Sequence, residues 1–187
     1  MHQTGFKLSY TYDTMARLSI LNPDPQVLSG PELLHELLAD HANSNAIAID
    51  YESSDGHRQQ VSYAELHARS DALAFRITGF RQSSRFIVPL YIPQSPELYI
   101  AELAVLKAGA AFCPVALDMP DDRLRFILTD VDATILLTTT SVNTRLPSLD
   151  GVEILKIDDT VSHDLPPSAD VSIYNSVPSR NDAAYIM

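Results

Sequence analysis

The sequence predicts an α/β fold in which a mainly parallel sheet carries helices on both of its faces. Four short apolar runs have the composition of buried strands, at residues 86–92, 111–115, 134–138 and 152–157. Helical stretches with recognisable start and stop signals connect the first three runs, at residues 96–107 and 118–128. Alternating strands and helices need crossover connections, which make the strands parallel and cover the sheet. With 187 residues, 45% of them hydrophobic, the chain suffices for one domain or part of a larger one.

The first 28 residues are expected to form an extended lead-in rather than part of the sheet. They show no sustained helical or strand period. The run Asn22-Pro23-Asp24-Pro25 disfavours both structures, because proline lacks an amide donor and restricts the residue before it. We therefore expect the domain to occupy residues 29–187.

Two capping-box patterns predict the first two helices. Ser29 with Glu32, and Ser62 with Glu65, have the spacing at which each side chain bonds a free backbone amide of the first turn. The apolar residues that follow recur on one helical face in both stretches: Leu33, Leu34, Leu37 and Leu38 in the first, and Leu66, Leu73, Ala74 and Ile77 in the second.

A β-hairpin is expected between these two helices. The first helix fades near residues 43–45, residues 46–51 have strand composition, and the turn signal at 53–56 precedes a short strand through Val61. The second helix is expected to stop at Gly79.

Several residues mark the boundaries of the central elements. Pro89 lies inside the strand at 86–92, and its missing amide argues for an edge position or a bulge there. The run Ser95-Pro96-Glu97 caps the next helix, with proline at its first position. Lys107 lies at the negative end of that helix, and Gly109 supplies a left-handed cap.

The C-terminal part continues the same alternation. Asp118 and Pro120 start a helix that runs through Leu128. Residues 158–182 are polar and contain prolines, so they are expected to form a surface loop, and residues 183–187 have the composition of another buried strand.

Charge and cysteine content exclude several classes of protein. A net charge of -11 at pH 7 argues against nucleic acid or an anionic membrane as the main partner. No apolar run is long enough to cross a bilayer, and residues 1–12 lack the apolar centre of a signal peptide. The single cysteine, Cys113, permits no intrachain disulfide, which fits a reducing compartment. We therefore expect a cytoplasmic protein with neither nucleic acid nor a membrane as partner.

One stretch carries more information than its local structure requires. The run Leu106-Lys107-Ala108-Gly109-Ala110-Ala111-Phe112-Cys113-Pro114 is followed by Asp118-Met119-Pro120-Asp121-Asp122-Arg123-Leu124. Helix caps and strand burial explain single residues but not the whole string. Together with residues 62–66, 95–98 and 123–128, it resembles the adenylate-forming enzymes, in particular the adenylation domains of nonribosomal peptide synthetases. The resemblance covers residues 29–187.

A departure from the usual family pattern narrows the resemblance. Adenylation domains of peptide synthetases usually show Pro-Leu-Asp-Pro after the short strand, where this chain has Pro114-Val115-Ala116-Leu117-Asp118. This form is similar to fungal enzymes, especially synthetases that assemble hydroxamate siderophores.

The resemblance implies a specific chemistry for the intact domain. Such domains bind ATP and Mg²⁺, activate an amino acid as an aminoacyl adenylate, release pyrophosphate, and pass the amino acid to the phosphopantetheine thiol of a carrier protein. The implied partners are the remainder of the adenylation domain and the carrier and condensation domains of the same synthetase. The sheet would be an incomplete part of the large N-terminal subdomain.

The resemblance assigns no catalytic, cofactor-binding or metal-binding residue to this chain. The family's phosphate-binding loop, rich in Thr, Ser, Gly and Lys, begins where the sequence ends, at Ala184-Tyr185-Ile186-Met187, and no GxxxxGKS/T pattern occurs. We therefore expect the chain alone to be inactive. We also expect it to be marginally stable or molten, because strands that would cover its sheet lie in the missing part.

Two groups of residues have metal-ligand chemistry without a metal-site pattern: His35, Glu36, Asp40 and His41, and Asp118, Asp121 and Asp122. The first group does not have HExxH spacing, and its histidines fall far apart around a helix. The helix dipole explains the second group. Cys113 lies in a predicted buried strand, where burial disfavours the nucleophilic thiolate.

Three other interpretations remain open from the sequence. The chain is a non-catalytic interaction module whose residues 1–28 and unpaired sheet edge dock onto a neighbouring domain. Alternatively, it belongs to an adenylate-forming enzyme outside peptide synthesis, such as an acyl-CoA ligase. A free-standing doubly wound binding domain would need a ligand loop at the carboxyl end of a strand, and the sequence shows none.

Overall fold

The computed structural model describes residues 30–82, 85–158, 178–179 and 181–187. The expected lead-in at 1–28 and most of the expected loop at 158–182 lie outside these residues. The described helices and strands are η1 (Leu34–His41), β1 (Ile47–Glu52), β2 (Arg58–Ser62), α2 (Tyr63–Thr78), β3 (Ile87–Tyr91), α3 (Pro96–Lys107), β4 (Ala111–Pro114), α4 (Asp121–Asp130), β5 (Ile135–Thr138), α5 (Thr140–Asn143) and β6 (Glu153–Lys156). No helix within these ranges is long and apolar enough to cross a bilayer.

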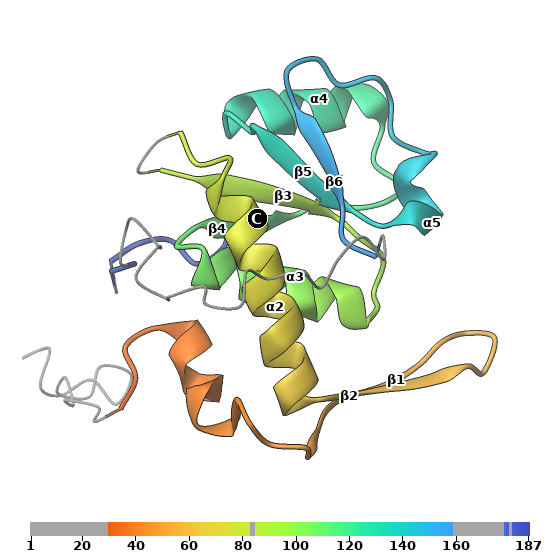
Figure 1. The fold of residues 1–187 in the computed structure, drawn as a ribbon. Coiled ribbons are helices and arrows are strands. Elements are labelled where there is room, and N and C mark those ends of the chain that lie inside the picture. Colours follow the sequence, from red (N-terminus) through yellow and green to blue (C-terminus); the bar gives the residue numbers. More distant parts are fainter. Residues whose placement is uncertain (1–29, 83–84, 159–177, 180) are drawn as a thin grey trace, which may run out of the picture. The chain divides into compact units, whose positions relative to one another are not determined.

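The predicted α/β fold with a mainly parallel sheet is confirmed. Strands β3 to β6 form a four-stranded sheet in the order β4-β3-β5-β6, and all three of its strand pairs are parallel. The predicted hairpin of β1 and β2 is a separate antiparallel pair (Figure 1). The four sheet strands match the four apolar runs, and the crossover helices α3 and α4 connect the first three.

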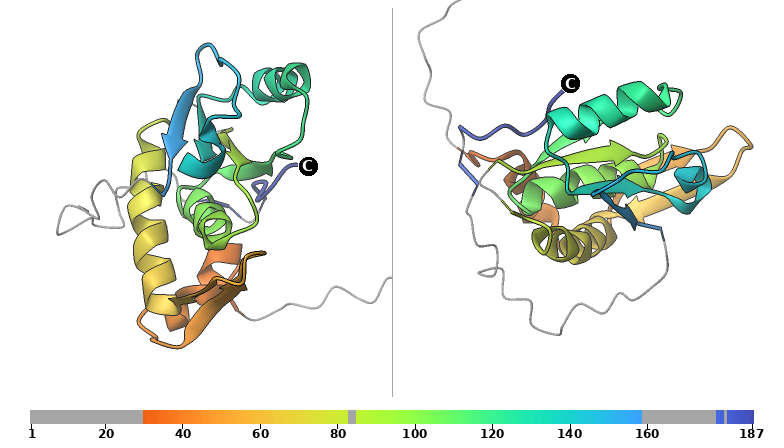
Figure 2. Two further views of the ribbon diagram at one scale, coloured as in Figure 1. Left: turned by 90° about the vertical axis from the view of Figure 1, so that its right-hand side faces the viewer. Right: turned by 90° about the horizontal axis from the view of Figure 1, so that it is seen from above.

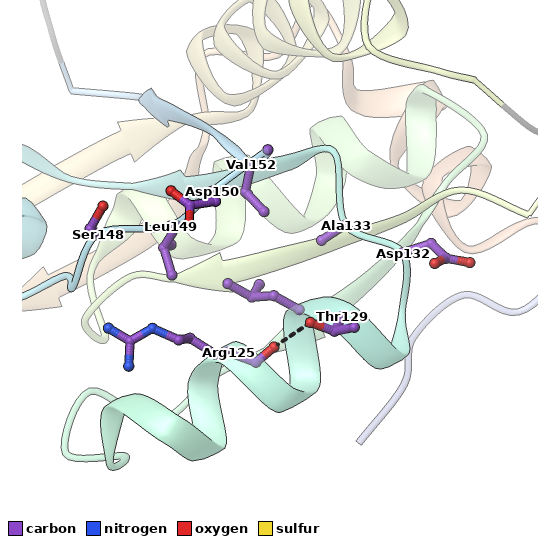
Figure 3. A pocket seen from close by; sticks show the side chains of 10 residues that line it. Arg125, Thr129, Asp132, Ala133, Ser148, Leu149, Asp150 and Val152 are labelled. Atoms are coloured by element: carbon purple, nitrogen blue, oxygen red, sulfur yellow. Dashed lines mark hydrogen bonds between the residues drawn. The ribbon is translucent and has the colours of Figure 1, made fainter.

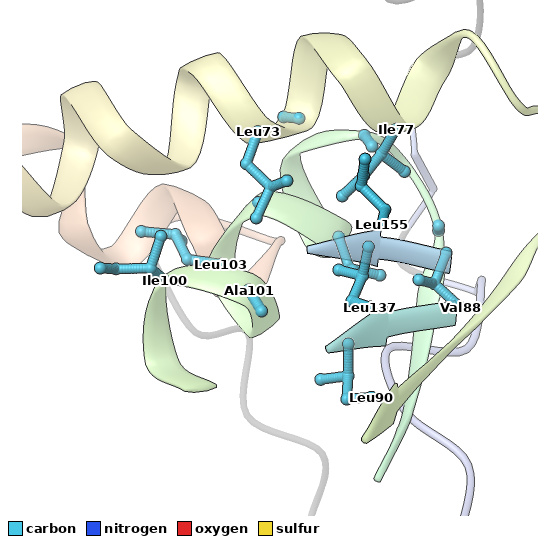
Figure 4. Close-up of a cluster of buried hydrophobic side chains, with 14 of the residues drawn as sticks. Leu73, Ile77, Val88, Leu90, Ile100, Ala101, Leu103, Leu137 and Leu155 are labelled. Carbon is cyan, nitrogen blue, oxygen red and sulfur yellow. The ribbon is translucent and has the colours of Figure 1, made fainter. Parts of the chain in front are cut away.

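Helices cover both faces of the parallel sheet, as predicted. Helices α2 and α3 lie on one face and α4 on the other, which the two views of Figure 2 show. Successive side chains of a strand point to opposite faces. Leu90 and Leu137 accordingly pack with α2 and α3, whereas Tyr91 and Leu136 pack with Leu124 of α4. Figure 4 shows the first cluster, in which Leu73 and Ile77 of α2 approach Leu155 and Leu137.

The start of α2 follows the predicted cap. The Ser62 hydroxyl accepts a hydrogen bond from the backbone amide of Glu65 at 3.2 Å. The four predicted inward-facing residues are all buried: Leu66, Leu73, Ala74 and Ile77. The helix stops at Gly79 as predicted, but this glycine has a right-handed φ of -63°, so no left-handed cap is formed.

Helix α3 has the predicted boundaries but not the predicted side-chain cap. Pro96 occupies its first turn, and Ser95 makes no capping hydrogen bond. The buried Ser95 hydroxyl has no hydrogen-bond partner among the described residues. At the other end, Gly109 has a φ of +67°, the left-handed conformation that was predicted. This turn delivers the chain directly into β4.

The prediction that Pro89 marks an edge or a bulge is wrong, because β3 lies inside the sheet between β4 and β5. The carbonyls of Phe86 and Leu90 accept hydrogen bonds from the β4 side. Alternate residues of a strand point to opposite neighbours, so Pro89 directs its nitrogen toward β5. The pairs recorded with β5 begin only after Pro89, at Leu90–Leu137. The missing amide therefore removes no bond from these pairs.

The first helix starts later than predicted. It is a 3₁₀ helix that begins at Leu34, and the carboxylate of Glu36 accepts a hydrogen bond from the amide of Leu33 at 3.3 Å. Glu36 thus takes the place that the capping-box pattern gave to Glu32. Ser29, the other half of that pattern, lies outside the described residues.

The predicted apolar face of this helix is largely exposed. Of its four leucines, Leu34 and Leu37 are 53% and 58% exposed. Leu33 and Leu38 are partly buried, and Leu38 packs against the core. In a 3₁₀ helix, residues three apart lie directly above one another. Leu34 and Leu37 therefore share one exposed edge. The predicted α-helix would have placed both on its buried face.

Residues 183–187 pair with the sheet but are not buried. The amide of Phe112 donates to the carbonyl of Ala184 at 3.1 Å, and the amide of Ile186 donates to the carbonyl of Phe112 at 2.9 Å. This parallel bridge adds to the outer edge of β4. Tyr185 and Met187 are 52% and 99% exposed, because the described residues provide no further layer or strand beside them.

Two smaller differences concern the helices that follow β4 and β5. Helix α4 begins at Asp121 rather than Asp118, since Pro120 occupies its N-cap position. The short helix α5 was not predicted, because four residues carry too little periodicity to be recognised.

Replacing a core leucine should destabilise the chain much more than replacing an exposed one. Leu137 is completely buried, so Leu137→Ala should lower the free energy of unfolding by about 2–5 kcal/mol. Leu37→Ala removes the same atoms from an exposed site and should change it by no more than about 0.5 kcal/mol. Urea unfolding followed by far-UV circular dichroism measures both. Equal losses would contradict the position of Leu137 in the core.

Candidate functional site

The lysine of the motif lies in a buried cluster of polar groups between α2 and α3. The Lys107 ammonium donates to the carboxylate of Asp71 at 2.6 Å, the hydroxyl of Ser70 at 2.8 Å and the Nδ1 atom of His67 at 3.2 Å. Its side chain is 10% exposed, and Ser70 is completely buried. Three donors of one ammonium are thus satisfied by three residues of α2. We call these four residues the Lys107 cluster.

The Lys107 cluster also reaches η1. The Nε2 atom of His67 lies 2.9 Å from the carbonyl oxygen of Leu38. A carbonyl only accepts, so Nε2 carries a proton and donates. With Nδ1 accepting from Lys107, the imidazole is neutral. One side chain therefore connects η1 to the pair formed by α2 and α3.

Burial dominates the electrostatics of this cluster. It lowers the pKa of Lys107, and the hydrogen bond and charge of Asp71 oppose that effect. Burial also lowers the pKa of His67, and the nearby Lys107 charge lowers it further. His67, Ser70 and the Lys107 side chain are largely buried, whereas the Asp71 side chain is 48% exposed. Because the ammonium donates to three residues of α2, the cluster is placed to stabilise the junction of α2 and α3. The sequence explanation of Lys107 by the helix dipole was incomplete.

Sequence reasoning missed His67, Ser70 and Asp71, although a signal for them was present. Ser70 lies four residues after Leu66 and four before Ala74, on the face of α2 that is otherwise apolar. A small hydroxyl in an inward-facing stripe indicates a buried polar partner. The identity of that partner depends on how α3 packs, which local sequence does not give.

The carboxyl ends of β3 and β5 lie where the strand order reverses, a common ligand position in doubly wound sheets. Polar groups there bond one another. The Thr138 hydroxyl donates to the carbonyl of Tyr91 at 2.9 Å, and the Tyr91 hydroxyl donates to the carbonyl of Leu117 at 2.8 Å. The backbone amide of Thr140 donates to the Asp158 carboxylate at 2.8 Å. These bonds hold loops together, and within the described residues they form no phosphate cradle.

The residues with metal-ligand chemistry are not brought together. The described part of the chain contains no group of three or more His, Cys, Asp or Glu side chains that fits a metal ion. The His41 ring lies 5.1 Å from the ring of Tyr63, and burial lowers the pKa of His35. Asp121 and Asp122 occupy the first turn of α4. Cys113 is buried as predicted, and burial raises the pKa of its thiol.

One hollow lies between α4 and the loop that precedes β6 (Figure 3). Its volume is about 440 Å³. Arg125 of α4 pairs with Asp122 at 3.3 Å, and its carbonyl accepts from the Thr129 hydroxyl at 2.9 Å. Asp150 and Ser148 line the hollow from the loop. Acidic, basic and neutral groups are mixed here and partly bonded within α4, so we assign no ligand to this hollow.

A larger groove, of about 690 Å³, lies between η1, the hairpin and α3. Its floor and walls are mostly apolar, and it contains three carboxylates. We call it the hairpin groove, with the lining residues Leu34, Leu38, Ala48, Ile49, Asp50, Tyr51, Glu52, Tyr63, Leu66, Gln94, Tyr99, Glu102, Leu103, Leu106 and Phe112.

Comparison with known sequences assigns this chain to a family. The profile of the family described as "AMP-binding enzyme" matches residues 38–187. Nonribosomal peptide synthetase 2 of Cochliobolus heterostrophus is 45% identical over 141 residues, which are 74% of this chain and 3% of that protein. Nonribosomal peptide synthetase SIDC of Beauveria bassiana is 44% identical over 148 residues, or 76% of this chain and 3% of that protein. The chain thus spans a small part of these relatives.

Solved structures show the same fold. The nonribosomal peptide synthetase FmoA3 in its AMPPNP-bound form superposes with a TM-score of 0.65 and 23% identity, over 75% of this chain and 15% of that chain. The N-terminal subdomain of Klebsiella oxytoca NpsA, in complex with 3-hydroxybenzoyl-AMSN, gives 0.55 and 24%, over 67% of this chain and 30% of that chain. The described sheet and helices therefore have the arrangement of an adenylation-domain N-terminal subdomain.

Removing the motif lysine should destabilise the helix junction. Lys107→Met leaves the buried Nδ1 atom of His67 without a donor, so the free energy of unfolding should fall by about 1–3 kcal/mol. Arg58→Met removes an exposed cation that pairs with Asp50 and should cost less than Lys107→Met, because solvent screens an exposed ion pair. Urea unfolding compares the two. A Lys107→Met chain as stable as the wild type would contradict a stabilising role.

Acidification should destabilise the chain in part through His67. Its pKa in the folded state lies below the ordinary value of 6.5, so the unfolded chain binds a proton that the folded chain excludes. Stability is therefore lost as pH falls from about 7 toward that lowered pKa. His67→Gln should reduce the slope by at most about 1.4 kcal/mol per pH unit.

The pH measurement has an internal comparison. Burial also lowers the pKa of His35, so His35→Gln should reduce the same slope separately. Unfolding free energies at several pH values between 5 and 8 give the slope for each variant. An unchanged slope in His67→Gln would show that His67 is not held neutral by folding.

Proposed function

Because this chain belongs to the family of AMP-binding enzymes, we propose that it is the N-terminal part of an adenylation domain that activates an amino acid for nonribosomal peptide synthesis. The observation that carries the proposal is the family match over residues 38–187, which includes the complete motif run from Leu106 to Leu124. The relatives named above are peptide synthetases, which favours amino acid activation over acyl-CoA ligation.

The proposed role of the described residues is to build the framework of the domain. The Lys107 cluster fixes α3 against α2, and the left-handed Gly109 turns the chain into β4. Strand β4 then pairs with β3 on one side and with residues 184–186 on the other. In this way the motif positions the sheet edge that leads to residue 187.

ATP and Mg²⁺ serve the reaction of the intact domain in this proposal, but we assign them no residue here. The described residues offer no fitting set of metal ligands, and the polar groups at the carboxyl ends of β3 and β5 bond one another. In this proposal no residue of this chain takes part in a chemical step. The catalytic, cofactor-binding and metal-binding residues lie outside it.

The wider setting is also a proposal. The domain begins at about residue 29 and works in a multidomain synthetase, with the rest of the adenylation domain and with carrier and condensation domains as partners. The names of two relatives support siderophore assembly, since the synthetase of Beauveria bassiana is SIDC and that of Epichloe festucae is sidN. An amino acid activated there would pass to a phosphopantetheine thiol. We place the protein in the cytoplasm.

A chimera tests whether this chain performs the proposed role. Residues 38–187 replace the aligned segment in the adenylation domain of the Cochliobolus relative, which is 45% identical. We expect amino acid-dependent ATP–pyrophosphate exchange within about tenfold of the parent, with unchanged amino acid preference, because the substrate pocket is contributed by the parent. The isolated chain should show no exchange.

Two results would contradict the proposal. One is a chimera that is folded, by circular dichroism and gel filtration, but inactive. The other is amino acid-dependent exchange by the isolated chain. A second chimera carrying Lys107→Met is the matched control. It should lose stability before it loses its affinity for ATP, because the Lys107 cluster supports the fold and contacts no substrate.

A further inference from the structure

The hairpin groove exposes apolar surface on opposing walls. Leu34 of η1 is 53% exposed and Tyr99 of α3 is 43% exposed. The lining also includes Leu38, Leu106 and Phe112, which are partly buried. Covering apolar surface is favourable by roughly 25 cal/mol per Å², so a partner with apolar side chains would be stabilised here.

The charged residues of the hairpin groove are all acidic. Its described lining contains Asp50, Glu52 and Glu102 but no lysine or arginine. Asp50 is already paired with Arg58 across the hairpin. Glu102 is different, since no hydrogen bond or ion pair joins it to any described residue. Burial raises its pKa, which means that its carboxylate is partly removed from water without a compensating cation.

Glu102 lines the groove from helix α3 together with two neighbours on the same helical stripe. Tyr99, Glu102 and Leu106 follow one another at helical spacings of three and four, so they form one stripe along α3. Strand β1 also lines the groove, with residues 48–52. A cation held at Glu102 would therefore have apolar contacts on both sides along the helix. This pattern suits an amphipathic polypeptide segment that carries a basic side chain among apolar ones.

We propose that the hairpin groove docks a basic, apolar polypeptide segment from a neighbouring domain of the same synthetase, with a lysine or arginine paired to Glu102. The source of the segment rests on the proposed function. The acidic lining repels the phosphates of nucleic acid and anionic lipid, which leaves a polypeptide as the complementary partner. The relatives are far longer than this chain, which spans 3% of the first two, so neighbouring domains are abundant there.

Peptide probes test the chemistry of the groove. The probes are two fluorescein-labelled amphipathic helices of 14 residues, one built from leucine and lysine and the other from leucine and glutamate. Fluorescence anisotropy should show saturable binding of the lysine peptide and at least tenfold weaker binding of the glutamate peptide. Glu102→Gln should weaken binding of the lysine peptide about tenfold, the loss expected for a charge-assisted hydrogen bond.

Matched variants separate the groove from the general acidity of the chain. Asp130→Asn removes the same charge from an exposed site at the end of α4 and should change binding less than twofold. Leu34→Asp should abolish binding through the apolar wall. Equal effects of Glu102→Gln and Asp130→Asn would overturn the proposal, and so would equal binding of the two peptides. Circular dichroism checks that each variant remains folded like the parent.

The source of the segment is tested in the complete synthetase. A photo-reactive p-benzoylphenylalanine at Tyr99, in a chimeric synthetase that carries residues 30–187 and so includes Leu34, should form a cross-link within the same polypeptide, to a domain adjacent in sequence. A cross-link between two synthetase chains, or a dimer of the isolated chain that the lysine peptide dissociates, would assign the groove to a second copy and overturn the proposal.

Pyrophosphate exchange is measured on the same chimera. An active chimera without groove binding overturns only the docking, and an inactive chimera whose groove binds overturns only the proposed function.

Discussion

The burial of one ammonium group, that of Lys107, is the constraint on which the junction of η1, α2 and α3 depends. A buried cation is unfavourable unless its donors are satisfied, and three residues of α2 satisfy them. His67 passes the connection on to the carbonyl of Leu38 in η1. Helix α3 therefore packs against α2 in one register, since a shift along either helix would leave a buried charge unpaired.

This register decides where the next strand begins. Helix α3 ends at Lys107, and the left-handed Gly109 reverses the chain so that β4 pairs with β3. The motif run thus fixes the distance and direction of β4 relative to the helix layer. Within the described residues, its lysine holds α3 against α2 and its glycine turns the chain into β4. Folding requirements alone account for Lys107 and Gly109 in the structure.

Two regions of the described surface differ in how far their polar groups are satisfied. At the carboxyl ends of β3 and β5, Thr138, Tyr91 and Asp158 bond to groups of this chain and hold its loops. In the hairpin groove, Glu102 is partly buried and bonds to none of the described residues. In a purely structural region, the polar groups form hydrogen bonds with other groups of the same chain. An unpaired carboxylate beside exposed apolar side chains suits contact with another surface instead.

The sequence by itself determined the types of the sheet strands and crossover helices and their succession along the chain, the Ser62 cap, the left-handed Gly109 and the enzyme family. Those features depend on periodicity, on contacts three or four residues apart, or on a motif read as a string. Only the tertiary structure decided the interior position of Pro89, the exposure of Leu34 and Tyr185, and the partners of Lys107. The hairpin groove belongs with these, because Glu102 is an ordinary polar helix residue until η1, β1 and α3 come together around one groove. Such features depend on which segments, distant in the chain, come to lie side by side.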